Sequence, residues 1–105
     1  MVIVETSVFT RRIQQFLVDD EHRELQSLLV ARPHLGKVIQ GGGGLRKTRY
    51  SYNNLGKSKA LRLIYYYAET RQQLLMLYVY PKSETADLTK SQVAALRKLI
   101  EATYP

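Results

Sequence analysis

The sequence predicts an α+β fold with the element order β-α-α-β-β-β-α. Three observations predict it: two helical patterns lie in the first third, three strand-like segments fill the middle, and one helical pattern ends the chain. The links between the central segments are short, which favours antiparallel neighbours. We therefore expect an antiparallel sheet with a helical hairpin and a C-terminal helix covering one face. At 105 residues, we expect a single domain over 1–105.

The first third begins with a strand and continues with a pair of antiparallel helices. Residues 2–5 (VIVE) are largely β-branched, and Thr6 or Ser7 can cap the helix that follows. Asp19 and Asp20 interrupt the first helical pattern, so we expect them to cap the second helix. Pro33 ends that helix, because proline disfavours helical geometry at the residue before it. The expected buried stripes are Phe9, Ile13, Phe16 and Leu17 in the first helix, and Leu25, Leu28 and Leu29 in the second.

The middle of the chain contains segments rich in β-branched and aromatic residues. The expected strands are 45–52, 60–68 and 73–80, preceded by an extended piece at Val38-Ile39 and joined by turns at 53–56 and 69–72. The last helix is expected to begin at Thr89, because Thr-Lys-Ser-Gln matches a capping box. Its buried stripe would be Val93, Leu96, Leu99 and Ile100.

The net charge of +7 lies entirely within residues 41–82. Basic and acidic residues balance on both sides of this segment, and Glu69 is its only acid. The segment also holds seven of the eight tyrosines. A basic, tyrosine-rich sheet favours a polyanionic partner, and RNA is our first interpretation. The basic residues are Arg46, Lys47, Arg49, Lys57, Lys59, Arg62, Arg71 and Lys82.

Alternation along the strands predicts which side chains share a face of the sheet. Met76, Tyr78 and Tyr80 alternate with Leu75, Leu77 and Val79, and Lys82 continues in phase with Tyr80. If the helices cover the aliphatic side, the open face carries Lys47, Arg49, Arg62, Tyr80 and Lys82. Ordinary surface cations are the alternative interpretation. Five positions converging with almost no acid nearby favour a binding site.

Several other kinds of chemistry lack the residues that they need. The chain has no cysteine for a disulfide or thiolate metal site, and Glu69 alone cannot supply a two-metal nuclease site. Gly56-Lys57-Ser58 lacks the earlier glycine and the following helix of a phosphate-binding loop. We therefore expect no metal and no cofactor. Apolar runs are too short for a membrane span and no secretory signal is visible, so we expect a cytoplasmic protein with no membrane partner.

Three motifs resemble the RelE superfamily of bacterial toxins, and most closely its HigB branch. They are Gly-Gly-Leu-Arg-Lys-Thr-Arg at 43–49, Leu-Arg-Leu-Ile-Tyr-Tyr at 61–66 and Leu-Tyr-Val-Tyr-Pro-Lys-Ser-Glu at 77–84. The resemblance covers nearly the whole chain and implies a RelE-like fold. It also implies a ribosome-dependent mRNA endonuclease that cuts codons in the ribosomal A site. A cognate antitoxin, a small helix-turn-helix protein like HigA, would keep it silent.

The resemblance implies roles for individual residues. Lys47 and Arg49 match a basic pair, Arg62 matches the arginine at the scissile phosphate, and Lys82 matches a basic residue after the last strand. The sequence departs from the family pattern at Ser83, where RelE has a second arginine, and the last helix lacks the tyrosine found in RelE. Tyr80 is the candidate substitute. The remaining basic residues, Arg46, Lys57, Lys59 and Arg71, would bind RNA or the ribosome.

The expected reaction needs no metal, because the 2′-hydroxyl of the RNA attacks the adjacent phosphate and leaves a 2′,3′-cyclic end. Arg49 and Arg62 suit the neutralisation of charge, since guanidinium pairs with phosphate through two parallel bonds. Lys47 or Lys82 would exchange protons, and Tyr80 would stack on a base or donate a proton. Two alternatives stay open. One is a non-catalytic RNA or ribosome binder that blocks translation, and the other is a basic protein-interaction module.

Overall fold

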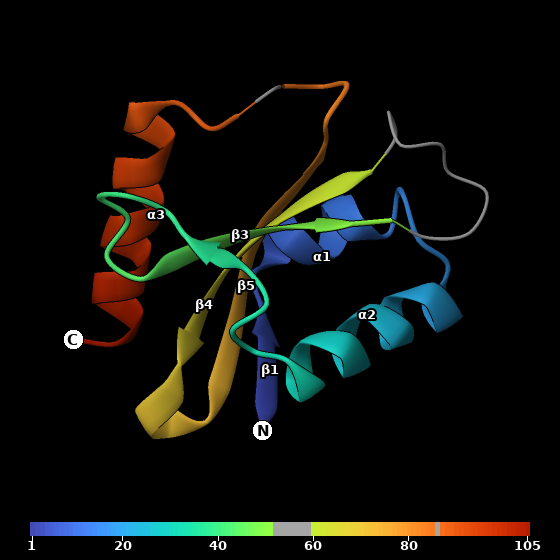
Figure 1. Cartoon of the computed structure of the whole chain (residues 1–105), viewed down its shortest axis with the longest axis horizontal. Helices are drawn as coiled ribbons and strands as arrows, with labels where there is room; N and C mark the ends of the chain where they lie inside the picture. Colours follow the sequence, from blue (N-terminus) through green and yellow to red (C-terminus); the bar gives the residue numbers. More distant parts are fainter. Residues whose placement is uncertain (52–59, 86) are drawn as a thin grey trace.

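The computed structural model describes residues 1–51, 60–85 and 87–105, and within them the chain forms one five-stranded sheet with three α-helices (Figure 1). The predicted α+β class is confirmed, and the expected extended piece near Val38 is a short additional strand. The elements are β1 (Val2–Glu5), α1 (Ser7–Ile13), α2 (Asp19–Ala31), β2 (Lys37–Val38), β3 (Leu45–Tyr50), β4 (Leu61–Ala68), a 3₁₀ turn (Glu69–Arg71), β5 (Gln73–Pro81) and α3 (Lys90–Thr103).

The sheet is mixed, whereas the sequence predicted an antiparallel one. Its strand order is β1-β5-β4-β3-β2. The antiparallel pairing of β3, β4 and β5 is confirmed, but β1 pairs with β5 in parallel, with Val2 opposite Gln73. The short links between β3, β4 and β5 predicted their antiparallel pairing. No such link joins β1 to β5, so link length could not indicate their direction.

The helices cover both faces of the sheet, which corrects the prediction that they cover one (Figure 1). The helices α1 and α2 pack on one face, and α3 packs on the other. The physical reason is that β4 and β5 carry aliphatic residues on both faces, so each face needs cover. The core under α1 and α2 includes Phe9, Ile13, Leu25, Leu29, Leu61, Leu63 and Met76; the core under α3 includes Leu45, Ile64, Leu75, Leu77 and Ile100.

A bulge changes the alternation within β5. Ile64 pairs with Tyr78, but the next residue, Tyr65, pairs with Met76, so Leu77 is the extra residue. Met76 therefore faces α1 and α2, while Tyr78 and Tyr80 face the α3 side. The expected grouping of Met76 with these two tyrosines is wrong for this reason.

The helix boundaries follow the predicted caps at two of three N-termini. The Thr6 hydroxyl accepts a hydrogen bond from the Phe9 N–H, and Thr89 forms the expected capping box with Gln92. The prediction that Asp19 and Asp20 cap α2 is wrong, because both lie within its first turn. Their carboxylates still suit the positive end of the helix dipole.

Tyr65 fixes the chain that leads from α2 into β2. Its side chain is buried, and its hydroxyl accepts a hydrogen bond from the Gly36 N–H and donates one to the Pro33 carbonyl. Any side chain at Gly36 would collide with the Tyr65 ring, since an added Cβ would lie 2.9 Å from it. This buried tyrosine thus holds the segment that carries Lys37. Within the described residues, no helix is long and apolar enough to cross a membrane.

Candidate nucleic-acid interface

The strand register brings the predicted basic residues of β3 and β4 next to a tyrosine of β5. Arg49 pairs with Arg62, Arg62 pairs with Tyr80, and Lys47 lies opposite Ile64 two positions along. Side chains at directly paired positions share a face, with Cβ atoms about 4.5–5.5 Å apart. The sequence prediction that Lys47, Arg49, Arg62 and Tyr80 share one face is therefore confirmed, but the prediction that this face is open is wrong. That face is the one on which α3 packs.

Arg62 and Tyr80 each carry a buried polar atom without a partner. Within the described part of the chain, neither Arg62 Nη1 nor the Tyr80 hydroxyl has a hydrogen bond. The Tyr80 side chain is fully buried, and Arg62 is half-buried. An unmade hydrogen bond at a buried group costs about 1–3 kcal/mol, and more for a charged one. Two such donors on paired positions suit an anionic oxygen that would satisfy both.

Tyr80 is held in its protonated form. Burial raises its pKa above the usual value of 10.0, the Asp87 carboxylate raises it further, and the Arg62 guanidinium opposes both. A tyrosine in this state can donate a proton or a hydrogen bond but is a poor base near neutral pH.

Asp87 brings an acid to this face, which the sequence analysis did not foresee. Its Oδ1 accepts a hydrogen bond from Lys47 Nζ at 3.0 Å and another from the Leu88 N–H at 2.8 Å. The Lys47 bond and the Leu88 N–H hold its pKa below the usual 3.8, with smaller help from Arg62. Forty positions separate Lys47 from Asp87, so no local pattern indicated the contact. The carboxylate neutralises one predicted cation of the site.

A hollow of about 380 Å³ lies beside these residues at the β2 end of the sheet. Among the described residues, four basic side chains and no acid line it: Lys37, Lys47, Arg49 and Arg62, together with Leu35 and Thr48. Lys37 was not among the predicted site residues. It pairs with Lys47 in the register, so the turn of the chain after α2 places it on the same face. Charge counting alone missed it, because residues 1–40 are neutral overall.

Other predicted residues lie elsewhere or have other contacts. Arg46 pairs with Tyr65, so its side chain starts from the opposite face, and it donates a hydrogen bond to the Gly36 carbonyl at 2.7 Å. Arg71 lies in the turn at the far end of β4, with its guanidinium 5.6 Å from the Tyr104 ring centre. Lys82 follows β5 directly with an exposed side chain. Lys57 and Lys59, and the expected turn at 53–56, lie outside the described residues.

Arg12 of α1 secures β5 close to the site. Its Nε donates to the Val79 carbonyl at 2.7 Å, and its Nη2 forms an ion pair with Glu84 Oε2 at 2.6 Å. Its guanidinium lies 4.7 Å from the centre of the Tyr78 ring. Arg12 therefore ties α1 to both β5 and the segment that follows it. The sequence offered no signal for this role, which depends on the tertiary fold.

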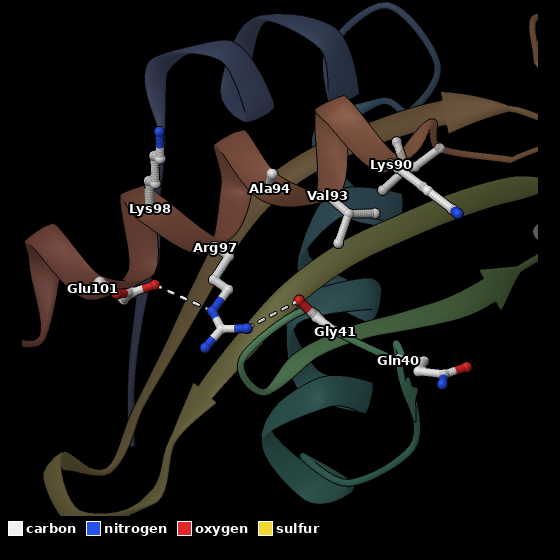
Figure 2. Close-up of a pocket in the computed structure, with 9 residues that line it drawn as sticks. Gln40, Gly41, Lys90, Val93, Ala94, Arg97, Lys98 and Glu101 are labelled. Carbon is white, nitrogen blue, oxygen red and sulfur yellow. Dashed lines mark hydrogen bonds and ion pairs between the residues drawn. The ribbon is translucent and has the colours of Figure 1, made fainter.

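A larger hollow of about 700 Å³ lies between α3 and the glycine-rich turn (Figure 2). Arg97 crosses it, with hydrogen bonds to Glu101 and to the Gly41 carbonyl at 3.2 and 3.3 Å (Figure 2). Gly43 has φ +65°, and an added Cβ would lie 3.0 Å from the Arg97 side chain. Gly43 therefore allows close packing against α3, and the Arg97 guanidinium is already paired. The smaller hollow is the better candidate for an anion.

Comparison with known proteins places this geometry in a family. Residues 1–104 match the family model described as the RelE toxin of the RelE/RelB toxin–antitoxin system. Among solved structures, the chain is similar to one from the crystal structure of the intact E. coli RelBE toxin–antitoxin complex. The TM-score is 0.55 at 13% sequence identity, with 76% of this chain and 94% of the other covered. At this identity the structural likeness shows the fold.

Proposed function

Because the chain belongs to the RelE family of toxins, we propose that it is a ribosome-dependent mRNA endonuclease. It would inhibit translation by cutting mRNA in the ribosomal A site, act in the cytoplasm, and form one toxin domain over residues 1–105. We further propose that it belongs to the HigB-like branch. Its cognate antitoxin would then be a small helix-turn-helix protein like HigA.

The observation that carries this proposal is the pair formed by Arg62 and Tyr80. Their unsatisfied polar atoms lie at directly paired strand positions, beside Arg49 and Lys47. A phosphate whose oxygen accepts from both groups would remove the cost of two buried unpaired donors. Because strands hold both side chains, the donors are placed before the substrate arrives, which is the condition for electrostatic stabilisation of a transition state.

The proposed reaction distributes three tasks among the site residues. The 2′-hydroxyl oxygen bonds to the phosphorus, the bond from phosphorus to the 5′-oxygen breaks, and a 2′,3′-cyclic phosphate and a 5′-hydroxyl result. Arg62 and Arg49 neutralise the charge that grows on the phosphate oxygens. Tyr80, kept protonated by its surroundings, donates a proton to the leaving 5′-oxygen. Lys47 or Lys82, as the neutral amine, accepts the proton of the attacking 2′-hydroxyl.

The products distinguish this reaction from the alternatives. Purified protein is added to ribosomes programmed with a defined mRNA, and the RNA ends are mapped with and without ribosomes. The proposal predicts cleavage inside the A-site codon, a 2′,3′-cyclic phosphate on the upstream fragment and a 5′-hydroxyl on the downstream one. Cleavage of the free mRNA at an equal rate would refute ribosome dependence.

A second candidate is a ribosome-binding inhibitor that does not cut RNA. The contact that favours it is the Lys47–Asp87 bond, because it engages one of the two candidate proton-exchanging lysines. In the same assay this protein would arrest translation and sediment with ribosomes while leaving the mRNA intact. A basic protein-interaction module would do neither without its partner.

A further inference from the structure

We propose that Lys37 and Arg49 form a second phosphate subsite, so that the RNA backbone leaves the Arg62–Tyr80 position across β3 towards the β2 edge of the sheet. The ligand is the phosphodiester that flanks the scissile one. This inference rests on the proposed function for the location of the scissile phosphate. It adds a binding residue, Lys37, and a direction for the RNA.

The strand register supplies the geometry. Lys37 on β2 is paired with Lys47 on β3, and Arg49 lies two positions further along the same face of β3. Paired side chains start about 5 Å apart, and positions two apart on one strand are separated by about 7 Å. Lys37, Arg49 and Arg62 thus surround one end of the sheet and line the same 380 Å³ hollow. That volume has room for a phosphate and part of a ribose.

Lys37 and Arg49 are both exposed, and their charges are unpaired within the described residues. The exposed state matters because a flanking phosphate stays partly hydrated while it binds, and a solvated cation can meet it at little desolvation cost. Lys37 therefore suits a phosphate contact that contributes affinity and register rather than chemistry. Arg49, which is paired with Arg62, is shared between this phosphate and the scissile one.

The opposite direction across the sheet is unfavourable to RNA. The Asp87 carboxylate, in the segment that follows β5, is bonded to Lys47 of β3 and keeps a lowered pKa, so it remains a negative charge near neutral pH. Beyond it, Leu88 packs with α3 against the sheet. A phosphate over Leu88 would meet an apolar surface, whereas the described residues that line the hollow on the β2 side include four cations and no acid. The hollow thus gives the RNA a favourable path towards β2.

The test measures binding to ribosomes programmed with a short mRNA that cannot be cleaved. The A-site codon carries 2′-O-methyl groups, and neutral methylphosphonate linkages replace its phosphates one at a time. Lys37→Ala should weaken binding to the fully charged mRNA several-fold and reduce the slope of log affinity against log salt by about 1. At one linkage next to the scissile phosphate, neutralisation should abolish the difference between Lys37→Ala and wild type.

Matched variants distinguish the loss of the subsite from the loss of any surface charge and from a folding defect. Lys98→Ala removes an exposed lysine of α3 and should leave affinity within about twofold, since a distant surface charge is largely screened. Lys37→Arg should keep most of the affinity, and all variants should melt at the wild-type temperature. The subsite is disproved if Lys37→Ala binds as wild type does, or if its loss is the same whichever linkage is neutral.

The outcome for the subsite is independent of the outcome for the proposed reaction. Cleavage of an unmodified mRNA by the wild-type protein is measured on the same preparation. Normal cleavage with normal Lys37→Ala binding removes the subsite and leaves the reaction standing. Linkage-specific loss of binding without any cleavage supports the subsite and removes the reaction.

Discussion

Arg62 of β4 and Tyr80 of β5 are directly paired across the sheet, and each keeps a polar atom buried without a hydrogen-bond partner in the described structure. Folded proteins satisfy nearly all such groups, because a buried unpaired donor lowers stability. Two of them on paired positions are therefore a sign of a site that is completed by a ligand. A phosphate is the ligand whose charge and geometry fit an arginine beside a protonated tyrosine.

Removing the Tyr80 hydroxyl should separate stability from activity. Tyr80→Phe deletes a buried group that has no partner in the described structure, so the free energy of unfolding should stay the same or rise by up to about 1–3 kcal/mol. Cleavage should fall, because the proposed proton donor is gone. Thermal melting and single-turnover cleavage are measured on the same protein. A loss of stability together with unchanged cleavage would contradict both the expected stability and the expected role of Tyr80 in cleavage.

Tyr65 offers the matched control, since its hydroxyl is fully used. Tyr65→Phe removes the partner of the Gly36 N–H and of the Pro33 carbonyl. The free energy of unfolding should fall by about 1–3 kcal/mol, measured by chemical denaturation. Catalysis at saturating substrate should change little. A Tyr65→Phe protein as stable as wild type would mean that these hydrogen bonds contribute nothing net.

Replacing Asp87 by asparagine should strengthen RNA binding. The carboxylate is bonded to Lys47 at 3.0 Å and lies on the face that would receive phosphate, so its removal frees a cation and deletes a repulsive charge. Affinity for programmed ribosomes should rise a few-fold, with a steeper dependence on salt. Glu101→Gln on α3, which also removes a carboxylate from a basic side chain, should change affinity less. Weaker binding by Asp87→Asn would show that the carboxylate helps to hold the RNA or the site.

Asp87 should also make the stability of the protein sensitive to acid. The direction of this effect follows from the lowered pKa of its carboxyl group. The folded protein binds the proton less readily than the unfolded chain does, so the contribution to stability is present above the unfolded pKa, near the usual 3.8. It is lost as pH falls through the lower, folded pKa. The effect should be small and should shrink in high salt, because the Asp87 side chain is 62% exposed. Acid unfolding of wild type and Asp87→Asn below about pH 5 checks this contribution. The difference between their free energies of unfolding should narrow as the pH falls.

The sequence was sufficient for features that depend on neighbouring residues. Helical and strand periodicities predicted the elements, Thr6 and Thr89 marked two helix starts, and short links predicted the antiparallel β3-β4-β5 pairs. Alternation also placed Arg49 and Arg62 on one face. Each of these depends on local geometry, which propensity and spacing can reveal.

Features that depend on tertiary packing could not be predicted in this way. Both faces of β4 are apolar enough to need cover, so the pattern did not show on which face α3 packs. The extra residue Leu77 shifts the alternation of β5, and no glycine or proline in this part of the strand indicates the bulge. Asp87 and Lys37 reach the site from segments outside the basic stretch, through contacts that only the folded chain makes.

The most direct test of the proposed reaction is single-turnover cleavage of A-site mRNA by Arg62→Ala. Arg23→Ala is the matched control, because Arg23 is exposed on α2 and lies outside the predicted site. Loss of a rigidly placed donor to the reacting phosphate should lower the rate by about 10²–10³-fold. Arg62→Lys should restore little, since an ammonium cannot offer two parallel donors. With melting temperatures unchanged, this loss in Arg62→Ala beside a nearly normal Arg23→Ala is the predicted result; cleavage by Arg62→Ala at the wild-type rate would contradict the proposed reaction.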